Sequence, residues 1–203
     1  MFIEHIFYSG ALAILIGMLF YKYTGRDSSW IIIICAWAPD VDDLEDLANP
    51  VLHNLGISFQ HGNFHNIAFM VIFSIAVAFL LLPFGIQFFD TLFFSLIGCG
   101  AHLFEDALVY DPGYRFLWPF SSKILGLGIL PHMINGEKYV WDFFHIANTE
   151  VLILGLLLIL AAFLIRTYVE TSLSWIRWYM PEKLYLKVSG RFSQEDRHRF
   201  LKK

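Results

Sequence analysis

Long uninterrupted apolar segments dominate this 203-residue chain and leave few soluble folds open to it. Hydrophobic residues make up 57% of the chain and charged residues only 16%, whereas soluble domains average about 25% charged residues. A segment of about 20 apolar residues crosses a bilayer as a helix, because the helix satisfies its own backbone polar groups. We therefore predict an all-α fold, a polytopic integral membrane helical bundle.

Five apolar segments define the predicted membrane helices, and the second is short because it stops at Pro39. Pro83 and Gly85 form a turn signal that makes the third and fourth helices an antiparallel pair. We expect short interfacial helices between residues 110 and 145. A basic amphipathic tail over residues 166–203 follows the membrane-embedded domain, residues 1–165. The predicted helices are residues 6–23, 30–38, 67–82, 88–104 and 146–165.

Lysine and arginine are distributed unequally between the two ends of this predicted bundle. If every segment crosses the bilayer, eleven of the fourteen basic residues lie at the end that carries the tail, and only Arg115, Lys123 and Lys138 lie at the other. Cytoplasmic segments are enriched in these residues. The tail is thus expected to be cytoplasmic in a cell or inner membrane, with the opposite end facing outward.

The cysteines and the total charge exclude other classes of protein. Cys35 and Cys99 both lie inside apolar segments, so neither a disulfide framework nor a zinc-binding cysteine pair is indicated. The net charge of −4 gives no basic surface for nucleic acid. We expect membrane lipids as partners and no nucleic acid.

The outward end of the predicted bundle collects residues of the kinds that bind metal ions. His61 and His65 precede the third helix with a spacing of four, and His102 and Asp106 repeat that spacing in the fourth. On a helix this spacing stacks two side chains on one face. Imidazole and carboxylate ligands suit zinc or a similar divalent ion. The predicted metal ligands are His5, Asp40, His61, His65, His102 and Asp106.

Three neighbouring residues are assigned further roles. Asp42, two residues after Asp40, could orient a water molecule or act as a general base. Arg115 is expected to bind a substrate phosphate, or else to anchor its loop by contacting lipid headgroups or Asp111. Glu105 points about 100° away from Asp106 around a helix and is expected to support a ligand rather than bind metal itself.

These motifs resemble those of the YdjM-like membrane-bound metal-dependent hydrolases over about residues 1–165. The resemblance rests on His5, the Pro39-Asp40-Val41-Asp42 motif, the histidines at 61 and 65, the His102/Asp106 pair and the segment 115–121. Many members have a longer third motif with His-Arg and a later His-Ser, where this chain has His61-Gly62 and His65-Asn66. The metal motifs are also loosely similar to those of zinc-dependent phospholipase C. The resemblance implies a helical bundle around a metal cluster with hydrolytic activity.

The predicted function is hydrolysis of a phosphoester by metal-activated water, at the level of the lipid headgroups. The substrate would be a phospholipid or another lipid-linked phosphate, and the cofactor zinc, with room for two ions. Two alternatives are a metal-ion transporter and a membrane scaffold with a structural metal. A transporter is expected to carry more polar residues within its spans than the third and fifth segments contain.

Overall fold

The computed structural model describes residues 2–44, 62–129, 149–171, 174–181 and 184–185. Within these ranges the chain is helical and contains no strand, which confirms the all-α prediction. The α-helices are α1 (Phe2–Thr24), α2 (Trp30–Cys35), α4 (Ile67–Leu81), α5 (Phe88–Val109) and α6 (Thr149–Glu170). The short 3-10 helices are η1 (Pro39–Leu44), η3 (Leu82–Phe84) and η5 (Ser174–Tyr179).

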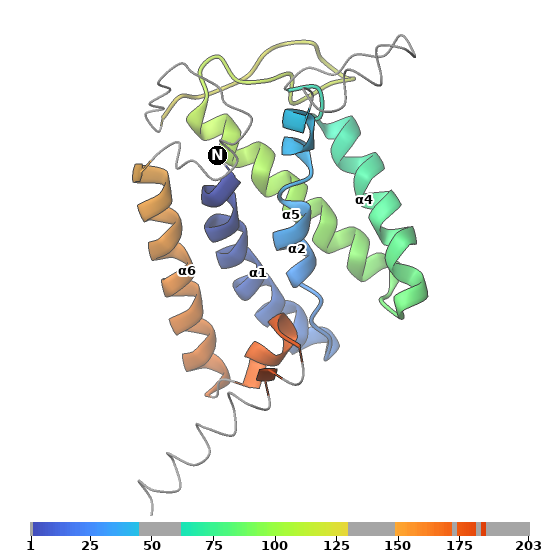
Figure 1. The fold of residues 1–203 in the computed structure, drawn as a ribbon, viewed down its shortest axis with the longest axis vertical. Coiled ribbons are helices and arrows are strands. Elements are labelled where there is room, and N and C mark those ends of the chain that lie inside the picture. Colours follow the sequence, from blue (N-terminus) through green and yellow to red (C-terminus); the bar gives the residue numbers. More distant parts are fainter. Residues whose placement is uncertain (1, 45–61, 130–148, 172–173, 182–183, 186–203) are drawn as a thin grey trace, which may run out of the picture.

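Four helices in the described part of the chain are long and apolar enough to cross a membrane. They are Glu4–Thr24, Ile67–Phe84, Phe88–Val109 and Val151–Glu170. The bundle is therefore an integral membrane fold, as predicted. Figure 1 shows that α1 and α4 run from one end of the bundle to the other and that α5 runs back.

The second predicted helix is shorter than expected. α2 has six residues, and turns at Ala36–Ala38 followed by η1 carry the chain the rest of the way back to the end where α1 begins (Figure 1). The backbone amide of Ala36 donates to Ile32 and that of Ala38 donates to Cys35, so the turn keeps its hydrogen bonds inside the protein. This return brings η1 to the end of the bundle that holds His5.

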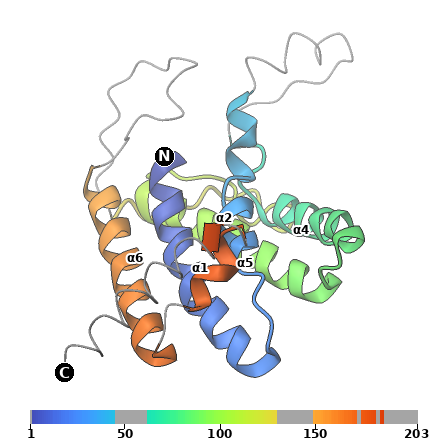
Figure 2. The same cartoon turned by 60° about the horizontal axis from the view of Figure 1, so that its bottom comes forward.

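Glycine allows two close helix contacts that fix the bundle. A Cβ atom on Gly98 of α5 would lie 2.6 Å from the Ile32 carbonyl oxygen, so only glycine permits α2 to pack this closely on α5. A Cβ on Gly155 of α6 would lie 3.0 Å from the Cβ of Phe7 in α1. Small residues at such crossings are a common means of helix packing in membranes. Figure 2 shows α6 beside α1 and α4 beside α5.

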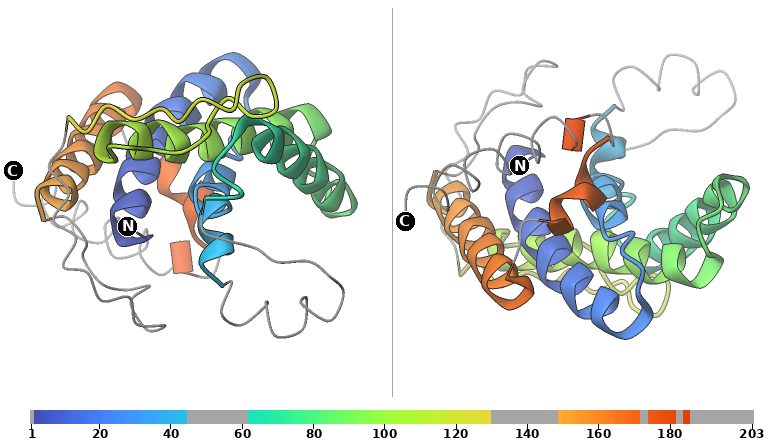
Figure 3. Two further views of the ribbon diagram at one scale, coloured as in Figure 1. Left: turned by 90° about the horizontal axis from the view of Figure 1, so that it is seen from above. Right: turned by 90° about the horizontal axis from the view of Figure 1, so that it is seen from below.

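The segment after the last long helix differs from the prediction. The expected boundary at residue 165 falls inside α6, and Arg166 is a fully buried residue of that helix. η5 turns back under the bundle, as the right-hand view of Figure 3, seen from below, shows, and Trp175 packs against Ala162 and Ile14. The predicted tail therefore begins with a segment that belongs to the core. Residues 186–203 lie outside the described residues.

Candidate metal centre

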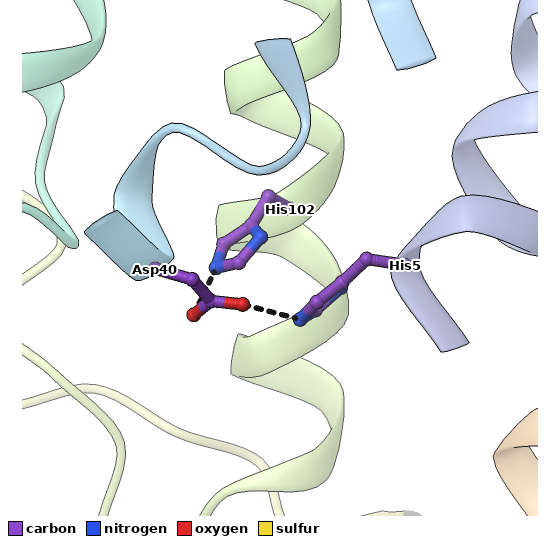
Figure 4. A group of neighbouring side chains, drawn as sticks. All are labelled: His5, Asp40 and His102. Atoms are coloured by element: carbon purple, nitrogen blue, oxygen red, sulfur yellow. Dashed lines mark ion pairs between the residues drawn. The ribbon is translucent and has the colours of Figure 1, made fainter. Parts of the chain in front are cut away.

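Five of the six predicted metal ligands meet inside one end of the bundle. His5 comes from the first turns of α1, Asp40 from η1, His65 from the segment before α4, and His102 and Asp106 from the last turns of α5. All five side chains are buried, with His65 having no exposed surface. Figure 4 shows Asp40 lying between the imidazoles of His5 and His102. The sixth predicted ligand, His61, lies outside the described residues.

Two carboxylates each face the three histidines with both oxygens. Asp40 places Oδ2 3.7 Å from His5 Nε2, and places Oδ1 3.4 Å from the Nε2 atoms of both His65 and His102. Asp106 places Oδ1 3.7 Å from His5 Nε2, and places Oδ2 3.2 Å from His65 Nε2 and 3.3 Å from His102 Nε2. The same ring nitrogen of every histidine therefore faces the same two carboxylates.

The separations within this cluster match those between ligands of one ion. Two atoms that bind zinc tetrahedrally at about 2.0–2.1 Å lie roughly 3.3 Å apart. His65 Nε2 and His102 Nε2 lie 3.3 Å apart. Most of the nitrogen–oxygen separations exceed the 2.7–3.2 Å of a good hydrogen bond. Two groups of ligand atoms each lie within 4.8 Å of one another, His5 with Asp40 and His102, and His65 with His102 and Asp106.

The other nitrogen of each imidazole faces a second partner outside the cluster. His5 Nδ1 lies 2.8 Å from Glu105 Oε2, and His102 Nδ1 lies 2.7 Å from the carbonyl oxygen of Ala36. Each of these acceptors requires a proton on Nδ1, which leaves Nε2 with the lone pair that a metal needs. The predicted supporting role of Glu105 agrees with this contact. Metal-binding histidines usually have such a second hydrogen-bond partner.

Asp42 lies on the other side of His65 from the two clustered carboxylates. Its Oδ2 atom lies 3.4 Å from His65 Nδ1 and accepts hydrogen bonds from the backbone amides of Gly62 and Phe64 at 3.0 and 2.9 Å. Asp42 therefore holds the 62–65 segment and faces the His65 ring, while its action on a water molecule stays a prediction.

The segment 62–66 around His65 is not helical, and the expected stacking of His65 on His61 involves a residue that lies outside the described chain. α4 begins at Ile67, because the Asn66 side chain accepts a hydrogen bond from the Phe69 amide and so caps the helix. Gly62 has a φ of +92°, which an L side chain rarely adopts. The helical spacing of His102 and Asp106 is confirmed within α5, where His102 Nε2 lies 3.3 Å from Asp106 Oδ2.

Burial and neighbouring charges shift the pKa values of Asp40 and His65, the two candidate ligands that lie outside the membrane spans. Burial alone would raise the pKa of Asp40, but the imidazoles of His102, His65 and His5 hold it well below its usual range. Burial alone would lower the pKa of His65, but Asp106, Asp40 and Asp42 raise it to about 11. The carboxylates thus create a site that demands positive charge, supplied by protons or by a metal ion.

The loop after α5 carries two further residues to consider, Tyr114 and Arg115. Tyr114, which the sequence did not identify, packs on His65 with ring centroids 4.4 Å apart, and its pKa is raised by burial and by neighbouring Tyr110, Asp106 and Asp40. Arg115 is exposed, and none of the ion pairs found among the described residues involves it. The alternative contact with Asp111 is therefore not observed within this part of the chain.

Comparison with known proteins supports the motif analysis. A family model described as YdjM inner membrane protein matches residues 1–175, a range that contains every described ligand and both supporting carboxylates. The match confirms the resemblance that the motifs predicted. No curated protein and no solved structure matches the chain.

Proposed function

We propose that this chain, which belongs to the YdjM inner membrane protein family, is a membrane-bound metal-dependent hydrolase of a lipid-linked phosphoester. The observation that supports the proposal is the convergence of three Nε2 atoms on two carboxylates, with a second partner behind the imidazoles of His5 and His102. Histidine and carboxylate ligands without cysteine are the usual set of zinc hydrolases.

The ligands suit two divalent ions, with zinc as the expected metal. Asp40 and Asp106 each direct one oxygen toward His5 and the other toward His65 and His102, so these five side chains could hold the metal together. Five candidate ligands exceed the three or four protein ligands of one zinc ion, which is why we expect two ions.

The bound metal would lower the pKa of water and polarise a phosphoryl oxygen. The residues of the chain contribute orientation and charge: Glu105 and the Ala36 carbonyl hold the His5 and His102 rings, and Asp42 fixes the segment of His65. Arg115, exposed on the loop that also carries Tyr114, is proposed to bind the phosphate of the substrate by paired hydrogen bonds.

The position of the centre supports a lipid-linked substrate and an outward orientation. The ligands lie in the last turns of α5 and the first turns of α1, at the level where spans approach the headgroups (Figure 1). The opposite end carries Lys22, Arg26 and Arg177. By the distribution of basic residues we propose that this opposite end is cytoplasmic and that the centre faces the other side.

A structural or transported metal is the second candidate, and the burial of all five ligands is the observation that favours it. A closed structural site holds its ion without an open position, whereas hydrolysis needs one. Transport would instead require the ion to leave along a path through the bundle.

The test is to purify the protein in mild detergent without chelators, then measure bound metal and phosphoester hydrolysis. We expect about two equivalents of a divalent ion in the wild type, loss of both in His102→Ala, and full retention in His198→Ala, a control histidine of the basic tail. The substrates would be phospholipids and lipid pyrophosphates in mixed micelles. Absence of metal from the wild type would refute the proposal. Bound metal with no hydrolysis of any of these substrates would favour the structural or transported ion.

A further inference from the structure

The loop that follows α5 exposes a group of large apolar side chains at the metal-centre end. We call this group the apolar loop surface. It is formed by residues that are between 41% and 85% exposed, although they lie outside every membrane span of the described chain. Its members are Leu117, Trp118, Phe120, Ile124, Leu127 and Ile129.

Hydrogen bonds fix this loop to the ends of two spans. The Phe116 and Trp118 carbonyls accept from the amides of Ile67 and Ala68, which are among the free amides of the first turn of α4. The Leu127 and Ile129 amides donate to the carbonyls of Ala107 and Leu108 at the end of α5, at 2.7 and 2.8 Å. In Figure 1 the loop accordingly crosses the upper end of the bundle, next to the start of α4.

The depth and charge of this loop identify its partner. A surface tied to the ends of two spans lies at the boundary between acyl chains and headgroups, where tryptophan is enriched. Arg115 and Lys123 are exposed beside the apolar residues, and Asp111 is the one acidic residue of the segment 110–129. The surface therefore combines apolar side chains with a small excess of positive charge, which matches acyl chains beneath a layer of phosphates.

We propose that the apolar loop surface inserts into the phospholipid leaflet on the metal-centre side, with Phe120 and Leu127 among the acyl chains and Arg115 and Lys123 at the phosphates. The loop connects this contact directly to the centre, because Tyr114 packs on His65 and pairs with Leu125 through a backbone bridge. The proposal concerns lipid contact alone, so it does not depend on the reaction that the metal centre performs.

The test places nitroxide labels on single introduced cysteines of the full-length protein in phospholipid nanodiscs. Phe120→Cys and Leu127→Cys report on the surface, Phe79→Cys on the exposed face of α4 is the lipid control, and Asn63→Cys is the water control. Collision rates with oxygen, which enters lipid, and with a water-soluble nickel complex are then compared. Cys35 and Cys99 are buried, and unsubstituted protein gives the background labelling.

We expect both surface positions to show an oxygen-to-nickel collision ratio several-fold above that of Asn63 and near that of Phe79. Nickel accessibility equal to that at Asn63 would overturn the proposal, because the surface would then face water. Low accessibility to both reagents would also overturn it, since another part of the chain or a second copy would cover the surface. Gel-filtration profiles and unfolding temperatures equal to those of the unsubstituted protein show that the substitutions leave the fold intact.

Discussion

Each histidine of the centre is oriented through the nitrogen that does not face the other ligands. Glu105 holds His5, the Ala36 carbonyl holds His102, and Asp42 faces His65. Such partners fix the ring orientation and raise the basicity of the ligand nitrogen. The rings are thus oriented by residues other than the candidate ligands, and these residues can be tested separately.

Glu105→Ala is expected to weaken metal binding by about 10–100-fold, the usual effect of removing a supporting partner. The loss should be confined to the ion nearest His5, because Glu105 contacts no other histidine through a hydrogen bond found among the described residues. Glu105→Gln keeps an oxygen acceptor for His5 Nδ1 and should recover most of the affinity. Competition with a chromophoric chelator measures both variants, and equal affinity for wild type and Glu105→Ala would contradict the assignment.

Metal binding should release protons, and it should tighten as the pH rises from 6 to 8. The pKa of His65 is raised to about 11 by Asp106, Asp40 and Asp42, so the metal-free imidazole is protonated near neutrality and must lose that proton to bind a metal. Calorimetry in buffers of different ionisation enthalpy should show at least one proton released per protein at pH 7. A binding enthalpy that is independent of the buffer would refute this.

The same shifts predict how the metal-free protein responds to pH. The ion pair of His65 contributes stability fully below its unfolded pKa of about 6.5, and this contribution is lost as the pH rises toward 11. The lowered pKa of Asp40 acts in the opposite direction, because its contribution is present above the ordinary value near 4 and is lost as the pH falls below it. The contribution of His65 and Asp40 to the stability of the metal-free protein should therefore be largest between about pH 4 and 6.5. Thermal unfolding over a range of pH values measures it.

Residue type and spacing were enough to predict which side chains meet in the cluster but not how their rings and carboxylates are oriented. His5, Asp40, His65, His102 and Asp106 stand out because ionisable groups at membrane depth are costly unless paired or functional. The Ala36 carbonyl has no signature in a sequence, since every residue carries one. The sequence places Asp42 two residues from Asp40, but it cannot show that the non-helical path of residues 62–66 brings two backbone amides to the Asp42 carboxylate.

At the scale of the helices, α2 shows that a segment too short to cross a bilayer can still be part of the core of a membrane protein. Six residues are too few to span a bilayer, but Ile31, Ile32 and Cys35 are buried and the helix packs against α1 and α5. The surrounding helices shield its polar turns from lipid, which is the condition under which irregular backbone is tolerated at that depth. The sequence could indicate a short second segment, but it could not show that a turn and η1 complete the return.

Gly98→Ala is expected to destabilise the protein by about 1–3 kcal/mol, the usual cost of overpacking. The added Cβ would lie 2.6 Å from the Ile32 oxygen and 3.0 Å from the Cys35 Cβ, so α2 and α5 must separate. That separation would stretch the contact between His102 and the Ala36 carbonyl and weaken metal binding as well. Gly100→Ala is the matched control, because its Cβ would meet only Met70 Sδ at an ordinary 3.6 Å. Equal unfolding temperatures and metal contents for the two variants would show that the close contact is unimportant.

Across the whole molecule, the candidate metal centre occupies one end and a separate polar network closes the other. Arg166 of α6 donates to Asp27 at 2.8 Å, to Glu170 at 2.9 Å and to the hydroxyl of Tyr179 in η5. The Tyr179 hydroxyl also donates to the Ala13 carbonyl of α1. The network therefore joins α1, α6 and η5. The sequence predicts a basic tail from residue 166 onward, but it cannot show that Arg166 lies buried against an aspartate 139 positions away.

This network predicts that the two ends can be disturbed independently. Asp27→Asn removes a negative charge that balances the guanidinium of the fully buried Arg166. We therefore expect a loss of about 3–5 kcal/mol in the free energy of unfolding. Asp90→Asn is the matched control, because it removes a partner from Arg26, whose side chain is 46% exposed, and an exposed pair is worth at most about 1 kcal/mol. Asp27→Asn combined with Arg166→Met should recover part of the loss, since neither member of the buried Asp27–Arg166 pair is then charged.

The metal content of all three proteins should equal that of the wild type when measured below the unfolding temperature, because the centre is built from residues at the far end of α1 and α5 (Figure 1). Thermal unfolding in detergent and elemental analysis of the same samples provide the two readings. If Asp27→Asn lost metal while still folded, the network would have to position α1 for His5, and its role would extend from closing the bundle to setting the geometry of the centre.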